Sequence, residues 1–154
     1  MKLNKFIKTL SDFDPKDIIF IGLGNQYRTD DGVGIIFLNR LKTIPEYHLS
    51  HFINAGTTPE NYLEEILERN AKAVVFIDAI QWGVKAGEIC FLSDNSIDWC
   101  GISTHSYSIK LIEQYLLNYQ DLQFFYLGIQ PETLQFGNNI SLNIGQKIQT
   151  FFNS

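Results

Sequence analysis

Three predominantly apolar stretches constrain the fold of this chain more than any other feature. They lie at residues 18–24, 73–80 and 122–129, and each has the length of a β-strand rather than of a helix. A strand without polar alternation is buried on both faces, which is typical of the central strands of a parallel sheet. The chain must therefore place further elements on both sides of such a sheet.

Helical patterns separate these strands. Apolar residues recur at helical spacing after Thr29-Asp30, after Thr58-Pro59, after His105 and after Ser141, and Thr29 or Asp30 stands where an N-cap is expected. We expect a weaker strand at 48–54 and another at 87–92, which follows the 73–80 strand so closely that a hairpin is favoured. The order predicts an α/β fold, a three-layer sandwich with an about five-stranded, mostly parallel sheet, one antiparallel strand, and helices on both faces.

Composition restricts the class of protein. The 154 residues suit one domain, which we place at 18–154 after an N-terminal extension, 1–17, that forms a lead-in or a short helix. A net charge of -5 without any run of Lys or Arg argues against nucleic acid and anionic membranes as partners. The only cysteines, Cys90 and Cys100, support neither a disulfide framework nor a structural zinc site, so we expect a cytoplasmic protein.

Three polar side chains are expected to converge at one edge of the sheet. In open parallel sheets, ligands bind outside the carboxyl ends of the strands. The first strand leads into a loop with Gly22, Gly24 and the adjacent carboxylates Asp30 and Asp31, and the 73–80 strand carries Asp78 near its end. The helix after His105 must run antiparallel to the strand that follows it, so its N-terminus lies at the same edge. Asp31, Asp78 and His105 therefore meet in one crevice.

Two carboxylates and one imidazole suit a divalent first-row metal ion with open positions for a substrate. The site could instead stay empty until a metal arrives on a partner. Other interpretations stand beside this one: Asp30 or Asp31 alone is more often a helix cap than a ligand, and an isolated His105 before a helix is more often a surface or capping residue. The first loop is no dinucleotide fingerprint, because Tyr27 occupies the third glycine position.

The sequence resembles the hydrogenase maturation endopeptidases, which process the large subunit of nickel-iron hydrogenases. The resemblance covers roughly residues 18–150 by this pattern. Its blocks occur in the family's order: Gly22-x-Gly24-Asn25 with Asp30-Asp31-Gly32-x-Gly34, Ala55-Gly56-Thr57-Thr58-Pro59-Glu60-Asn61, Ile77-Asp78-Ala79, Gly87-Glu88-Ile89, Ser103-Thr104-His105 and Leu127-Gly128-Ile129-Gln130-Pro131. The blocks look most like the branch that matures the hydrogenase 3 type large subunit. Asn54 departs from the pattern, since many relatives have an acid there, and some relatives have Glu in place of Asp31.

This resemblance implies an endopeptidase that removes a short C-terminal extension from the large-subunit precursor after nickel insertion. The implied metal ligands, which would also be the catalytic groups, fall on Asp31, Asp78 and His105. The nickel would be carried by the substrate, and other divalent metals could substitute for it. An acid such as Asp31 or Asp78 would act as the base, as in an aspartyl protease. The loops expected to contact the substrate contain Gly22, Gly24, Asn25, Asp30, Gly56, Thr104 and Gln130.

Two other functions remain open from the sequence. A non-catalytic nickel or precursor chaperone would bind the nickel-loaded large subunit without shortening it. A flavodoxin-like module would bind a small ligand through the Gly22-Gly24 loop, although carboxylates stand where a phosphate would need hydrogen-bond donors. We expect a monomer whose partner is another protein.

Overall fold

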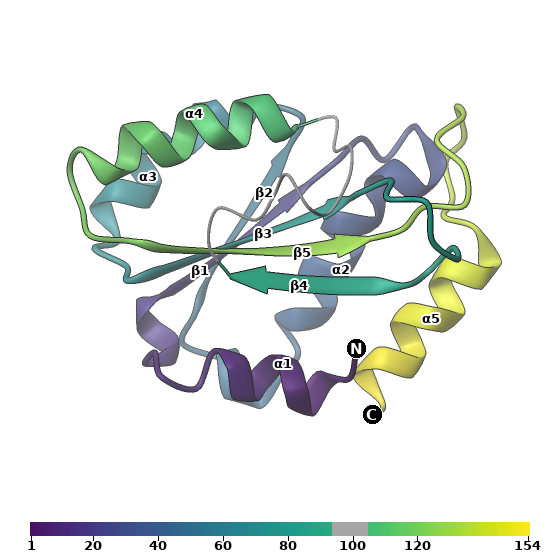
Figure 1. Ribbon diagram of the computed structural model, residues 1–154, viewed down its shortest axis with the longest axis horizontal. Helices are drawn as coiled ribbons and strands as arrows, with labels where there is room; N and C mark the ends of the chain where they lie inside the picture. The colour runs from purple at the N-terminus through teal and green to yellow at the C-terminus, as the bar shows by residue number, and fades with distance from the viewer. Residues whose placement is uncertain (94–104) are drawn as a thin grey trace.

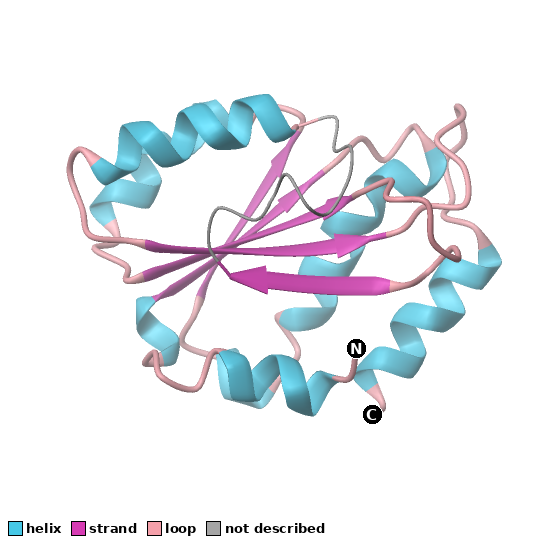
Figure 2. Ribbon diagram, in the orientation of Figure 1, coloured by secondary structure: helices cyan, strands magenta, loops and turns pink. Residues whose placement is uncertain are grey.

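The computed structural model describes residues 1–93 and 105–154 and forms three layers (Figures 1 and 2). The sheet has the order β2-β1-β3-β5-β4. Its strands are β1 (Ile18–Leu23), β2 (His51–Gly56), β3 (Ala73–Ala79), β4 (Ile89–Ser93) and β5 (Gln123–Ile129). The helices are α1 (Leu3–Thr9), α2 (Val33–Leu41), α3 (Leu63–Glu68), α4 (Ser106–Leu117) and α5 (Leu142–Phe152). Short 3-10 helices are η1 (Pro15–Asp17), η2 (Thr29–Gly32), η3 (Pro45–Tyr47) and η4 (Pro59–Tyr62).

The central strands are buried on both faces, as their apolar sequences predict. Every residue of β1 and β3 is buried. Alternate residues of β1 enter two separate cores: Phe20 packs with α1, α2 and α5, whereas Ile19 and Ile21 pack with α3 and α4. Figure 1 shows these two groups of helices on opposite sides of the sheet. The predicted three-layer α/β architecture is confirmed.

Strand β4 corrects one prediction. It is antiparallel, as expected, but it forms no hairpin with β3, because it pairs with β5 from Ile89 opposite Ile129 to Ser93 opposite Phe125. The adjacent edge of β3 is occupied by β5 along its whole length. The physical reason is burial: six of the seven residues of β5 are buried, which suits an interior strand, whereas β4 is only partly buried and suits the sheet edge.

The start of β2 also differs from the sequence prediction. The strand begins at His51 and not at His48, because Pro45–Tyr47 forms η3 and the Nδ1 of His48 donates to the carbonyl of Pro45 at 2.8 Å. The other end of the strand extends to Gly56. Strand β2 pairs in parallel with β1 and is the second edge strand of the sheet.

Residues 1–17 contribute to the core. Helix α1 buries Leu3 and Phe6, and the ring of Phe6 contacts the rings of Phe20 and Phe151. The two ends of the chain lie side by side, where the backbone N–H of Leu3 donates to the Oγ of Ser154 at 3.1 Å (Figure 1). Among the described residues, no helix combines the length and apolarity needed to cross a membrane.

One buried hydroxyl in this core gives a stability prediction. Tyr47 packs against Phe6 and Phe20, and its hydroxyl has no hydrogen-bond partner among the described residues. Burial also raises the pKa of this phenol. Because an unpaired buried hydroxyl is costly, we expect Tyr47→Phe to leave the free energy of unfolding unchanged or to raise it by up to about 1 kcal/mol in urea denaturation.

The exposed Tyr27 provides the matched control, since removal of its hydroxyl in Tyr27→Phe should leave stability unchanged. A loss of more than about 1 kcal/mol in Tyr47→Phe would show that the hydroxyl has a stabilising partner.

Candidate functional site

The loops that follow the parallel strands meet at one edge of the sheet, on the right of Figure 1. Backbone hydrogen bonds join them directly. The N–H of Gly24, after β1, donates to the carbonyl of Gly56, at the end of β2, at 2.9 Å. The N–H of Ile80, after β3, donates to the carbonyl of Ile129, at the end of β5, at 3.0 Å. Side chains from four strands are therefore held at one edge.

A buried carboxylate and imidazole pair lies at this edge. Asp78, near the end of β3, is 2% exposed, and its Oδ1 accepts the N–H of Ala79 at 2.8 Å. The Nδ1 of His105 donates to the Oδ2 of Asp78 at 3.2 Å. His105 is the residue before α4, and its carbonyl accepts the N–H of Ile109, the first bond of that helix. The start of α4 thus fixes the imidazole against the end of β3.

The surrounding charges raise the pKa of His105. Burial of the imidazole, the largest single cause, lowers this pKa. The hydrogen bond and negative charge of Asp78, together with the charges of Asp31 and Glu60, raise it by more. The protonated imidazole is therefore favoured in the folded protein. The effect of Asp31 also shows that its carboxylate lies within electrostatic range of the pair.

Asp31 is held in the first loop by the backbone. It is buried in η2, and its Oδ2 accepts the N–H of Asn25 at 2.9 Å. The side chain of Asn25 in turn accepts the N–H of Tyr27, which closes the loop. Gly24 has a φ of +123°, and a Cβ there would lie 1.8 Å from the carbonyl oxygen of Asp31, so only glycine fits. The predicted loop residues Gly24 and Asn25 thus position the carboxylate.

The three predicted ligands approach one another without forming a closed metal site. Asp78 and His105 are in direct contact, and Asp31 acts on His105 through its charge. Within residues 1–93 and 105–154, no group of three His, Cys, Asp or Glu side chains is arranged to hold a metal ion. The donor types fit a first-row divalent metal, but Asp78 and His105 are directed at each other. A metal ion could bind at the Nδ1 of His105 only if this pair opened.

Asp30 is not the helix cap that the sequence suggests. Its side chain is 0% exposed, and it caps neither η2 nor α2. Its carboxylate accepts the N–H groups of Glu132 and Thr133 and both the N–H and the hydroxyl of Ser141, at 2.7–3.0 Å. Asp30 therefore ties the first loop to the segment between β5 and α5.

Thr29 makes a second set of bonds to the same segment. It has a φ of 43°, which is unusual for a β-branched residue. Its hydroxyl lies 2.9 Å from the carbonyl oxygen of Thr133 and 3.0 Å from that of Gln135, and its N–H donates to Gly137 at 3.0 Å. Backbone strain of this kind persists where the surrounding structure enforces it, often at functional sites. The first loop is thus fixed along the whole segment 133–137.

The other predicted loop residues lie at the same edge. Gln130 is buried, and its Oε1 accepts the N–H of Trp82 at 2.9 Å, so it orders the loop after β3. Gly22 is buried within β1, and Gly56 ends β2. Thr104 lies outside the described residues.

Glu60, Thr133 and Ser141 are not predicted as site residues from the sequence. Glu60 directly follows the Thr58-Pro59 pair, in a block that resembles the family. Its position after β2 was the signal that could have placed it at the same edge. For Thr133 and Ser141 the sequence offers no comparable signal, because their contact with Asp30 joins distant parts of the chain.

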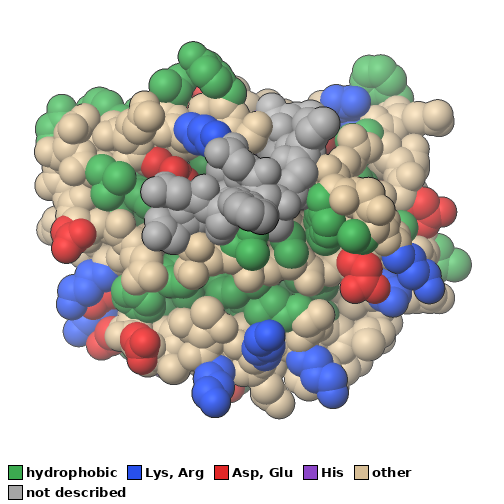
Figure 3. Space-filling view, viewed as in Figure 1, with side chains coloured by type: hydrophobic (Ala, Val, Ile, Leu, Met, Phe, Trp, Pro, Cys, Tyr) green, Lys and Arg blue, Asp and Glu red, His purple; other side chains and the backbone are tan. Residues whose placement is uncertain are grey.

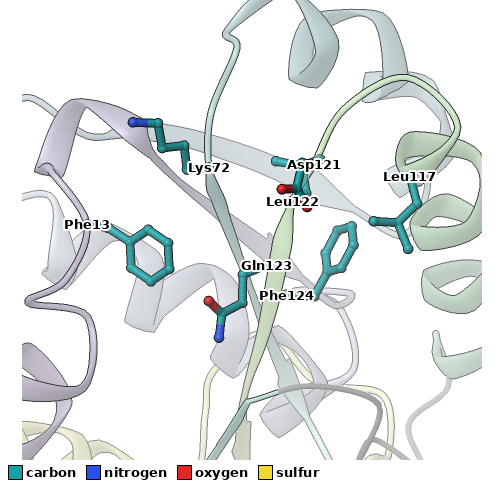
Figure 4. A pocket seen from close by; sticks show the side chains of 7 residues that line it. All are labelled: Phe13, Lys72, Leu117, Asp121, Leu122, Gln123 and Phe124. Carbon is teal, nitrogen blue, oxygen red and sulfur yellow. The ribbon is translucent and has the colours of Figure 1, made fainter.

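A cavity of about 520 Å³ lies at the opposite edge of the sheet. It is lined by Phe13, Lys72, Leu117, Asp121, Leu122, Gln123 and Phe124, at the amino ends of β3 and β5 (Figure 4). None of the predicted site residues reaches it. Cavity volume alone therefore does not identify the functional site. We identify the site from the polar groups at the carboxyl edge of the sheet.

Comparisons with known proteins agree with the family resemblance that the sequence shows. A protein family described as hydrogenase maturation protease matches residues 38–154. The hydrogenase 3 maturation protease of Escherichia coli K12 is 26% identical to the chain over 136 residues, which cover 87% of this chain and 85% of that protein. The family match begins after the first loop, so Asp31 enters the site through the geometry described above.

Two solved structures have the same fold. The NiFe hydrogenase maturation protease HycI from Thermococcus kodakarensis aligns with a TM-score of 0.77 and 24% identity, covering 97% of this chain and 94% of its own. The hydrogenase maturating endopeptidase HybD from E. coli aligns with a TM-score of 0.73 and 20% identity, covering 88% and 87%.

Replacement of Asp30 tests its structural role. Asp30→Asn keeps the size of the side chain but substitutes a donor for one acceptor oxygen, which leaves buried N–H groups unpaired. We expect the free energy of unfolding to fall by at least about 2 kcal/mol in urea denaturation. Asp12→Asn, at an exposed position, is the control and should change stability by less than about 0.5 kcal/mol. Equal stability of the two variants would contradict the role of Asp30.

The titration of His105 tests the electrostatics. By NMR, its imidazole should titrate above the ordinary pKa of 6.5, and Asp78→Asn should lower this pKa more than Asp31→Asn does. With a raised folded-state pKa, the protonated His105 stabilises the fold below pH 6.5, and this stabilisation is lost as the pH rises through the folded-state pKa. A wild-type pKa at or below 6.5 would contradict this account.

Proposed function

Because the chain belongs to the hydrogenase maturation protease family, we infer that it is an endopeptidase that processes the C-terminus of a hydrogenase large-subunit precursor. The observation that best supports a site for this function is the buried pair of Asp78 and His105 at the carboxyl edge of the sheet. Asp31 lies within electrostatic range of His105. The similarity to a hydrogenase 3 maturation protease favours a precursor of the hydrogenase 3 type.

We propose that nickel held by the precursor is recognised by Asp31, Asp78 and His105. Two carboxylates and an imidazole are suitable donors for a divalent first-row metal. In the structure, His105 and Asp78 neutralise each other, which suits a site that receives its metal from a partner rather than one that stores it. The metal then belongs to the substrate, and other divalent ions could replace it.

The residues of the site would move a proton during this recognition. His105 holds a proton on Nδ1 and shares it with Asp78. An imidazole nitrogen binds metal only when it has lost its proton, so engagement of nickel at Nδ1 requires this proton to leave. Its loss also frees the Oδ2 of Asp78 from the hydrogen bond, while the N–H of Ala79 still holds Oδ1.

Peptide hydrolysis would then rely on a carboxylate base. A water molecule must lose a proton as it adds to the scissile carbonyl. Asp31 or Asp78 would accept that proton and pass it to the amine that leaves as the C–N bond breaks. In this sense the enzyme is an aspartyl protease. Because one chain carries all three residues, we propose that a monomer is active, in the cytoplasm where the precursor would be assembled.

Cleavage of purified, nickel-loaded precursor tests the site. We expect His105→Ala and Asp78→Asn to reduce the rate of shortening at least about 100-fold, because each removes a ligand and a proton-transfer partner. Mass spectrometry of the large subunit measures the product. His48→Ala, which removes an exposed imidazole, is the control and should cleave at the wild-type rate.

Intact cleavage by His105→Ala would overturn the assignment of the site. Binding of the nickel-loaded precursor by the wild-type chain without any shortening would instead identify a chaperone. A rise in melting temperature with flavin or nucleotide but not with nickel would favour a small-ligand module.

A further inference from the structure

An apolar groove begins beside the candidate site and follows α4. It has a volume of about 330 Å³ and is lined by Glu60, Leu63, Tyr107, Ser108, Leu111, Ile112 and Tyr115. Leu63 belongs to α3, and all but Glu60 of the remaining lining residues belong to α4. This volume is at the lower limit of the range of about 300–1,000 Å³ for small-ligand pockets. It therefore suits a few side chains of a bound polypeptide better than a cofactor.

The outward face of α4 forms one wall of this groove. Tyr107, Leu111 and Tyr115 are spaced four residues apart, so they lie in a row along the helix. They are 75%, 49% and 41% exposed, and hydrophobic side chains are visible on the surface over α4 in Figure 3. The opposite face of α4 is already packed into the core through Ile109 and Leu116. The exposed row is therefore not needed for the fold, and apolar rows of this kind mark protein interaction sites.

The Glu60 end of the groove lies at the same edge of the sheet as the candidate site. Glu60 lines the groove and belongs to η4, which follows the carboxyl end of β2, and His105 directly precedes α4, whose first turns line the groove. Tyr107 is only two residues beyond His105. Any polypeptide segment that reaches His105 from this side passes over the groove.

The occupant can be specified from the geometry. Leu111 lies six positions after His105, which corresponds to about 9 Å along the helix axis. An extended chain covers about 3.3 Å per residue, so roughly three residues span this distance. Glu60 at the entrance disfavours an acidic neighbour and favours a basic one.

We propose that this groove binds an apolar side chain of the large-subunit precursor, about three residues from the segment held at Asp78 and His105. This proposal rests on the proposed function, because it takes the precursor as the partner. The groove is then a specificity subsite of the enzyme. It recognises the amino-acid sequence next to the cleavage site independently of nickel.

Binding of the nickel-free precursor tests the groove separately from catalysis. We expect Tyr107→Ser and Leu111→Ser each to raise the Kd at least about tenfold, as measured by calorimetry. Leu49→Ser is the matched control, since Leu49 is 59% exposed and lies before β2, at the opposite edge of the sheet. It should leave the Kd within about twofold of the wild type. The melting temperature of each variant verifies that the fold is intact.

A precursor variant makes the test specific. Replacement by Asp of an apolar residue about three positions from the cleavage site should weaken binding of the precursor to the wild-type chain. The same replacement should weaken binding to Leu111→Ser much less. Additive effects would place that residue elsewhere and overturn the proposal.

The outcomes also separate the groove from the proposed function. An unchanged Kd in both groove variants overturns the proposal that the groove binds the precursor, even if the wild-type chain cleaves the nickel-loaded precursor. A raised Kd in these variants supports the groove, even if the wild-type chain cleaves nothing. A wild-type dimer that Leu111→Ser converts to a monomer, with the Kd unchanged, assigns the groove to a second copy of the chain and overturns the proposal.

Discussion

The buried carboxylate of Asp30 connects segments that are 102–111 residues apart in the sequence, and the candidate site depends on this connection. Burial of a charge is costly unless hydrogen bonds replace its hydration, and here three N–H groups and one hydroxyl do so. The bonds fix η2, which contains Asp31, against the start of α5. The neighbouring carboxylates thus divide two tasks, since Asp30 holds the loop and Asp31 faces the site.

The site itself combines precise positioning with internal neutralisation. Asp78 and Asp31 each have one oxygen fixed by a backbone N–H, so neither carboxylate can turn away from the edge of the sheet. His105 occupies the second oxygen of Asp78. A cationic partner therefore competes with a proton for these donors. Such competition would make recognition depend on the charge that the partner brings to the site.

The sequence predicts those features that follow from local pattern and from topology. Continuous apolar strands require a sheet covered on both faces, and strand ends in such a sheet place Asp78 and His105 at one edge. The partner of β4 could not be read in this way, because its short connection to β3 says nothing about β5, which is inserted between them later in the chain. The role of Asp30 was hidden for a similar reason: its bonding partners are mostly backbone groups of a remote loop, whose position only the complete fold defines.

The groove beside α4 suggests how so small a domain could select its substrate. A metal ion and a single apolar side chain are each weak and unspecific signals. When both belong to one polypeptide, binding of the first brings the second to a high effective concentration at its site, so the two contributions reinforce each other. The separation of about 9 Å along α4 sets the spacing that a substrate must match. On this reasoning, bound nickel would indicate that the precursor is complete, and binding in the groove would distinguish one precursor from another.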